Sequence, residues 1–252
     1  QFLHEDSSPL HAIHASLQET PLVAGSGEFG GGCGIDGLYM NTVQNGLCRL
    51  ALLAGSRMEH QAGDTVLAAR HHDDARGLEQ AMKRYCVGKD GCWLWCVDKD
   101  SLLPDPEIIE HPINKGFGGI NGVGCMQADL FGFNAGSGQY LGIDECRNTF
   151  HKLANTPLRK EQFEKYGIWT QFDEPPLNYM MSPSYGHGYA LMMMLLLGEM
   201  DMAEKALSYL AEATWRPPKR YKLDRESPYW FYERYHSPDL QDEAGWDQGC
   251  GA

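Results

Sequence analysis

Long apolar runs are missing from this sequence. Its longest run, YALMMMLLLGEM at 189–200, has the length of a core helix and falls short of the roughly 18 apolar residues that a membrane span needs. The start of the chain has no basic stretch followed by an apolar one, so no signal peptide is predicted. We expect no membrane span, and the cellular compartment stays open. Because the chain begins with Gln1 rather than Met, we expect an N-terminal portion to be missing.

Positive charge is also scarce. Lys and Arg number 21 against 34 Asp and Glu, which gives a net charge of −13 that is spread along the chain. This average field repels a polyanion, so nucleic acid is not an expected partner. The expected partner is a small-molecule substrate.

Several motifs with known chemistry are absent. The eight cysteines form no C-x-x-C pair; Cys92 and Cys96 are the closest, and they do not supply the two close pairs of a structural zinc site. We expect mainly free thiols, with at most one or two disulfides. The stretch GEFGGGCG lacks the Lys-Ser/Thr of a phosphate loop, and neither G-x-S-x-G nor H-E-x-x-H occurs. We therefore expect no metal and no cofactor.

What the sequence does contain is an alternation of helical patterns and glycine-rich loops. Three times, a Gly/Pro-rich loop delivers polar and aromatic residues to the start of an apolar helix. One histidine pair, at 71 and 72, lies on a polar helix pattern and is expected to be solvated. The predicted elements are helices at 9–19, at 38–54 closed by Gly55, at 64–86 with a bend near Gly77, at 189–200 and at 201–213 capped by Asp201, short polar helices within 147–156 and 159–167, and a strand at 92–98.

Outer helices with charged faces alternate with inner helices that are almost entirely apolar. This pattern favours an all-α fold, an α/α toroid whose inner helices surround a cavity, with a few short strands. We expect one domain over 1–252. A full ring of six hairpins needs a longer chain, so the ring is expected to be short or to lack its N-terminal hairpins.

The stretch GGGCGIDGLYMN, at 30–41, holds the candidate catalytic residues. Cys33 lies on a glycine-rich loop before a helix, where the helix field favours a thiolate. Asp36 could act as an acid or a base, and Tyr39 as a proton donor. The alternative is structural: Asp36 caps the helix, Tyr39 forms a wall, and Cys33 fills a small apolar space.

Other polar and aromatic residues are candidates for substrate binding. Asn45 lies with Asn41 on one face of an apolar helix, so these amides either tie the loop backbone together or line a wet cavity. His187 is flanked by glycines and could reach a cavity, or could be structural. Aromatic residues concentrate near the loops, where they line a cavity or pack the core. The full set of candidate binding residues is Asn45, Trp95, Asn121, Glu174, Tyr179 and His187.

The segments LHAIHASLQETPLVAGSGEFGGGCGID, GLYMNTVQN and GGINGVGCMQADLFGFN resemble the linalool dehydratase-isomerase family. GCWLWCVD and GHGYALMMMLLLGEMDMAEKALSYL are similar to its later segments. The resemblance spans almost the whole chain and the later part of the family's length. It implies an (α/α)6 barrel, in which Cys33 matches a cysteine that is catalytic in water loss and allylic rearrangement of terpene alcohols. Asp36 matches the residue three positions after that cysteine.

The leading hypothesis is therefore a lyase or isomerase acting on a small, mostly apolar, terpenoid-like substrate. Cys33 would be the acid/base or covalent group, Asp36 would orient or relay the proton, and Tyr39, Asn45 and Asn121 would hold the substrate hydroxyl. We expect a missing N-terminal segment or a second copy of the chain to complete the site. One alternative is a glycoside hydrolase or polysaccharide lyase with Asp36 and Glu174 as paired carboxylates. Another is a non-catalytic binding module.

Overall fold

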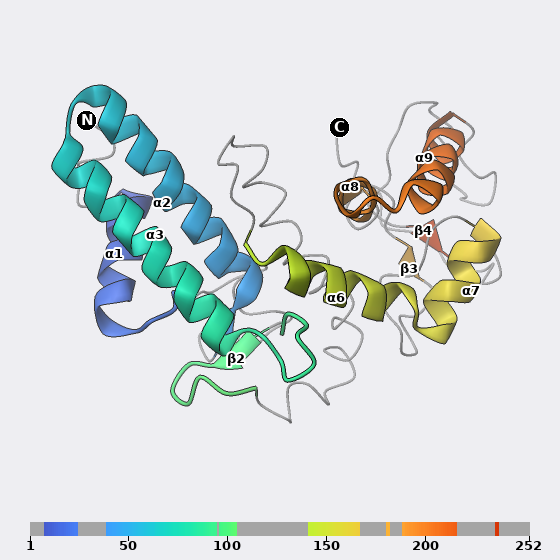
Figure 1. Ribbon diagram of the computed structural model, residues 1–252, viewed down its shortest axis with the longest axis horizontal. Coiled ribbons are helices and arrows are strands. Elements are labelled where there is room, and N and C mark those ends of the chain that lie inside the picture. Colours follow the sequence, from blue (N-terminus) through green and yellow to red (C-terminus); the bar gives the residue numbers. More distant parts are fainter. Residues whose placement is uncertain are drawn as a thin grey trace. The chain divides into compact units, whose positions relative to one another are not determined.

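The computed structural model describes residues 8–24, 39–94, 96–104, 141–166, 180–181, 188–215 and 235–236 (Figure 1). The chain divides into two compact units. The first comprises Gln1–Ile109 with Gln127–Thr149, and the second Glu110–Met126 with Phe150–Ala252.

The first helix described in the first unit is α1, Pro9–Glu19, as the sequence predicts. The Ser8 side chain accepts a hydrogen bond from the His11 backbone N–H, and Pro9 occupies the first turn, so the helix start is fixed by local chemistry. Leu10, Ile13 and His14 are buried on one face. The spacing of these three residues places them on the side that packs along the next helix.

Helices α2, Thr42–Ala62, and α3, Thr65–Tyr85, form an antiparallel hairpin (Figure 1). The predicted bounds of the first helix, 38–54, are wrong at both ends, because 39–41 form a strand and Gly55 lies inside the helix. The turn uses Gly63, whose φ of +91° favours glycine, and Asp64, whose side chain accepts from the Leu67 N–H at 2.9 Å. Helix α3 is not broken at Gly77, where it runs without interruption, and the bend expected there stays a prediction.

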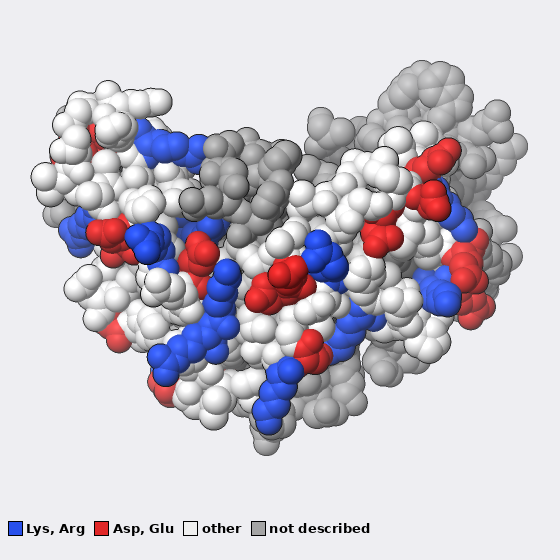
Figure 2. All heavy atoms as spheres, viewed as in Figure 1, with Lys and Arg blue, Asp and Glu red and all other residues white. Residues whose placement is uncertain are grey.

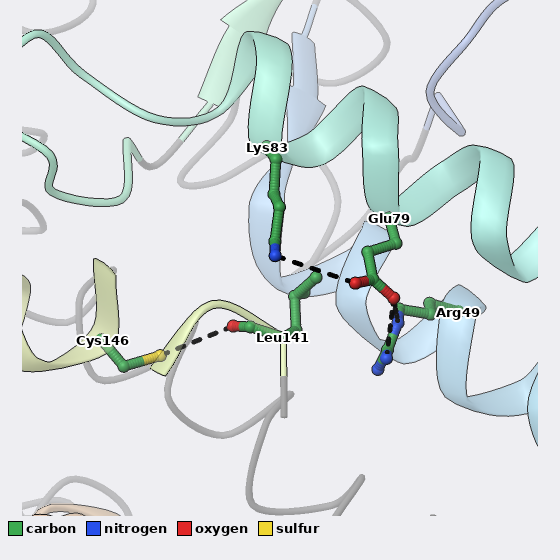
Figure 3. Close-up of polar contacts among 5 residues, drawn as sticks. All are labelled: Arg49, Glu79, Lys83, Leu141 and Cys146. Carbon is green, nitrogen blue, oxygen red and sulfur yellow. Dashed lines mark hydrogen bonds and ion pairs between the residues drawn. The ribbon is translucent and has the colours of Figure 1, made fainter. Parts of the chain in front are cut away.

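Polar side chains join the two helices of this hairpin. The Nε and Nη2 atoms of Arg49 donate to Glu79 Oε2 at 3.1 and 3.0 Å. Figure 3 shows Glu79 between this buried arginine and Lys83, whose Nζ lies 3.8 Å from Oε1. Ser56 Oγ donates to the Ala68 carbonyl at 2.8 Å. These links fix the register of α2 against α3 around an apolar core formed by Leu50, Leu52, Ala68, Ala75, Leu78, Ala81 and Met82.

A short antiparallel strand pair lies at the start of α2. Strand β1, Tyr39–Asn41, pairs with β2, Cys96–Asp98, with Met40 opposite Val97. Thr42 Oγ1 donates to the Leu94 carbonyl at 2.5 Å, and a bridge joins Val87 to Trp93. The strand predicted at 92–98 is therefore confirmed for its last three residues.

The first turns of α6, Ile143–Ala154, belong to the same unit, and the boundary between the units falls within this helix. Thr149 Oγ1 accepts from the Trp93 backbone N–H at 2.9 Å, and Cys146 Sγ lies 3.9 Å from the Leu141 carbonyl oxygen (Figure 3). Gly142 has a φ of +65°, and a side chain there would meet the Trp93 ring. This close approach positions the start of α6 against the segment that leads to β2.

The second unit contains α7, Pro157–Tyr166, α8, Gly188–Leu197, and α9, Met200–Trp215. Strands β3, Met180–Met181, and β4, Tyr235–His236, form an antiparallel pair. Helix α9 begins one residue before Asp201, so this residue lies in the first turn and the prediction that it caps the helix is wrong. Lys205 Nζ donates to the Glu164 carbonyl and lies 5.6 Å from the centroid of the Phe163 ring, which links α9 to α7.

The described residues are mostly helical, which confirms the helical class, and the toroidal arrangement stays a prediction. None of the helices described is both long and apolar enough to cross a membrane. On the face drawn in Figure 2, basic and acidic side chains are interspersed, as expected from a charge spread along the chain.

Candidate functional site

The amide of Asn45 holds the segment that precedes the glycine-rich stretch. Its Oδ1 accepts from the Val23 N–H at 2.7 Å, and its Nδ2 donates to the Val23 carbonyl at 3.0 Å. Asn45 is fully buried in the first turn of α2. Of the two predicted roles for this amide, tying a loop backbone is thus seen directly, whereas substrate binding by Asn45 stays a prediction.

The far end of the glycine-rich stretch is attached at the same place. Strand β1 begins at Tyr39, pairs with β2, and runs directly into α2 at Thr42. Val23 and Tyr39 are therefore both held at the N-terminal end of α2, Val23 by the Asn45 amide and Tyr39 by the strand pair. Residues 25–38, which lie between them, are outside the described residues.

Few of the predicted site residues are among the residues that the structure describes. Asn45 is described in full, and Tyr39 by its backbone only. The others lie outside the described residues: Cys33, Asp36, Trp95, Asn121, Glu174, Tyr179 and His187.

The side chains of four other cysteines are described, and of these Cys48 and Cys86 are free thiols. Burial raises the pKa of Cys48 to about 11, and it raises the pKa of Cys86 to about 11 against a smaller opposing effect of the Thr42 hydroxyl. Cys92 and Cys146 are buried as well. Because the thiolate is the reactive form, Cys48 and Cys86 are poor nucleophiles.

A buried pair of histidines lies where α1 meets α3, and sequence reasoning missed it. His14 Nε2 and His71 Nδ1 are 2.7 Å apart, and the two rings are nearly parallel, with centroids separated by 4.8 Å. On its other side, His14 Nδ1 bonds Asp74 Oδ2. His71 is only 2% exposed, so the prediction that this histidine is solvated is wrong, whereas its neighbour His72 is exposed.

The environment of His71 disfavours a positive charge. Burial lowers the pKa of His71, and the neighbouring His14 lowers it further. Glu59 on α2 and Asp74 on α3 oppose this shift, while Arg70 adds to it. Two sequence signals point to the cluster: His14 lies on the apolar face of its helix, and His71 and Asp74 are three positions apart on theirs.

The described residues contain no group of three or more His, Cys, Asp or Glu that could hold a metal ion. In the histidine pair, three of the four ring nitrogens are occupied by the two contacts above. One ring nitrogen of the pair, His71 Nε2, therefore lies outside these two contacts.

Comparison with models of known protein families gives no match, and no curated protein matches the sequence significantly. The resemblance to the linalool dehydratase-isomerase family stays a prediction from the sequence patterns.

Proposed function

We propose that the protein is a lyase or isomerase that removes water from, or rearranges, a small, mostly apolar alcohol. Cys33 and Asp36 carry out the acid–base chemistry. The observation that carries the proposal is the double hydrogen bond between Asn45 and the Val23 backbone, together with the strand pair that begins at Tyr39. These contacts fasten both ends of the segment that bears the thiol and the carboxylate to one helix end.

The fastening matters because catalytic groups must be held in a narrow geometry. A 14-residue glycine-rich segment with free ends would sample many conformations, whereas closing its ends removes much of that freedom. Asn45 is fully buried, so the anchor lies in the packed interior rather than on the surface. This supports a role for residues 25–38 that requires a defined position.

The proposed reaction is a balanced proton transfer. One of the two groups, the acid, donates its proton to the leaving hydroxyl, the C–O bond breaks and water departs. The other, the base, takes a proton from the adjacent carbon, whose C–H electrons form the new double bond. Transfer of that proton back to the first group restores both for the next cycle. An apolar cavity favours the reaction because it excludes bulk water.

Alkylation of the folded protein tests the role of Cys33. We expect iodoacetamide to modify Cys33 more than about a hundredfold faster than Cys48 or Cys86, because a pKa near 11 leaves these two almost entirely as thiols. Peptide mass spectrometry measures the rate at each cysteine. Release of alkene from a panel of small allylic alcohols, followed by gas chromatography, measures activity in the same samples.

Variants separate this chemistry from general damage. Cys33→Ser and Asp36→Asn should each lower turnover by at least about a hundredfold with an unchanged circular dichroism spectrum. Cys250→Ser, which removes a thiol near the C-terminus, serves as the matched control and should retain activity. Full turnover by a protein that is completely alkylated at Cys33 would exclude the thiol from the reaction.

A further inference from the structure

The histidine pair joins a short helix to the hairpin beneath it. Helix α1 is held by the apolar residues Leu10 and Ile13 and by His14, which contacts two residues of α3. At this junction α2 contributes Gly55, where an added Cβ would lie 2.6 Å from Leu10 Cδ1 and 3.4 Å from the His71 ring. The three helices therefore meet closely around the two imidazoles.

The donor and the acceptor of each hydrogen bond in the cluster follow from its contacts once the charge states are given. With Asp74 ionised and both rings neutral, His14 Nδ1–H donates to the carboxylate, and His14 Nε2 accepts from His71 Nδ1–H. His71 Nε2 is then left with a lone pair. This atom is buried and has no hydrogen-bond partner among the described residues. It is the ring nitrogen of the pair at which an additional proton can bind.

A proton at that atom creates a buried cation. The charged groups acting on His71 are Glu59 from α2, Asp74 and Arg70 from α3, with His14 the titratable group from α1. The sum of these charge effects and of burial favours the neutral His71 ring. Separation of α1 from α3 would expose the ring to water and remove the penalty for burying the charge.

We propose that His14, His71 and Asp74 form a pH-sensitive latch that keeps α1 docked on the α2–α3 hairpin at neutral pH and releases it in acid. The latch does not depend on the function proposed for Cys33. The direction follows from linkage. Because the folded-state pKa of His71 is lowered, the undocked state binds more protons between that pKa and the ordinary value of about 6.5. Docking of α1 is therefore fully favourable above about pH 6.5, weakens as the pH falls through this window, and stops weakening below the folded-state pKa.

Hydrogen exchange on the full chain tests the latch. After correction for intrinsic exchange rates, the opening constant of α1 amides should rise as the pH falls from 8 to 5, by up to about tenfold per pH unit within the window. Amides of α9, in the other unit, provide the internal reference and should show no such rise. Constant protection of α1 across this range would overturn the proposal.

Three variants assign the effect to the latch. His71→Asn keeps a donor near the Nδ1 position but removes Nε2, so α1 should stay protected and its pH dependence should flatten. His72→Asn alters the exposed neighbour and should retain the wild-type dependence. Leu10→Ala loosens α1 at every pH without changing the slope. A slope that survives in a folded His71→Asn protein would assign the titration elsewhere and refute the latch.

A second measurement covers the case in which His71→Asn fails to fold. The ring proton shifts of His71 in the wild-type chain, followed by NMR, should report proton uptake in step with α1 opening. A His71 ring whose shifts stay constant to pH 5 while α1 opens would refute the latch.

Discussion

The hairpins α2–α3 and α8–α9 close in the same way but are held together differently. Both turns contain a glycine with positive φ, Gly63 at +91° and Gly198 at +81°. The first hairpin is joined by charged and hydroxyl side chains that reach from one helix to the other, including Arg49 to Glu79. In the second, α8 reads GYALMMMLLL, in which the Tyr189 hydroxyl is the one polar side-chain group.

This difference shows what sets helix register in each unit. An arginine that donates two hydrogen bonds to one carboxylate oxygen accepts few alignments of two helices, whereas an apolar surface accepts several. In the second hairpin, the described buried side chains of α8 and α9 are apolar, Met193 and Met194 on α8 and Ala203 and Ala206 on α9. Methionine adapts its shape to its neighbours, so this packing specifies register less strictly.

The largest expected effect comes from breaking the polar contact of the first hairpin. Arg49→Ala should lower the free energy of unfolding of this unit by about 3 kcal/mol, because Glu79 loses two hydrogen bonds and the buried arginine stem leaves a cavity. Denaturant unfolding, with hydrogen exchange of α2 and α3 amides to locate the change, measures the loss.

Two matched variants sharpen this test. Arg49→Lys keeps the charge but not the planar fork, so it should cost less than Arg49→Ala. Arg57→Ala removes an exposed arginine from the same helix and should change stability by less than about 0.5 kcal/mol. Equal losses at positions 49 and 57 would show that the buried contact does not hold the hairpin.

Local signals in the sequence were sufficient for some elements and not for others. Helix α1 could be predicted because Ser8, Pro9 and the spacing of Leu10 and Ile13 all lie within a few residues of its start. The end of α2 could not, because Gly55 resembles a stop signal. Its actual role is to let Leu10 and His71 approach the helix, and these residues are distant in sequence.

The same reason explains the histidine cluster. The letters HHDD at 71–74 describe a polar helix surface, whereas His71 is buried by residues that are distant in sequence, His14 on α1 and Gly55 on α2. For the candidate site, the sequence identified Asn45 as a buried amide that needs a partner but could not name Val23 as that partner. Such a contact depends on how the segment after α1 packs against the start of α2.

A smaller loss is expected from the anchor of the glycine-rich segment. Asn45→Ala leaves the buried N–H and carbonyl of Val23 without their partner and should cost about 2 kcal/mol. Exchange of the Val23 amide should accelerate more than that of α3 amides. Asn45→Asp is the informative comparison, because its carboxylate can accept from the Val23 N–H but repels the Val23 carbonyl. We expect Asn45→Asp to be no more stable than Asn45→Ala.

The smallest expected changes in stability come from replacing one glycine in each hairpin by alanine. The two changes should have opposite signs. Gly77 lies within α3 with nothing within 4 Å of an added Cβ, so Gly77→Ala should stabilise the first unit by about 0.8 kcal/mol through higher helix propensity. Gly198 also has open space, but its φ of +81° strains any other residue, so Gly198→Ala should destabilise the second unit by about 1 kcal/mol. Because neither side chain would meet a neighbour, the two values isolate the backbone contribution. A loss at Gly77 would mean that α3 bends there in solution, as the sequence pattern suggested.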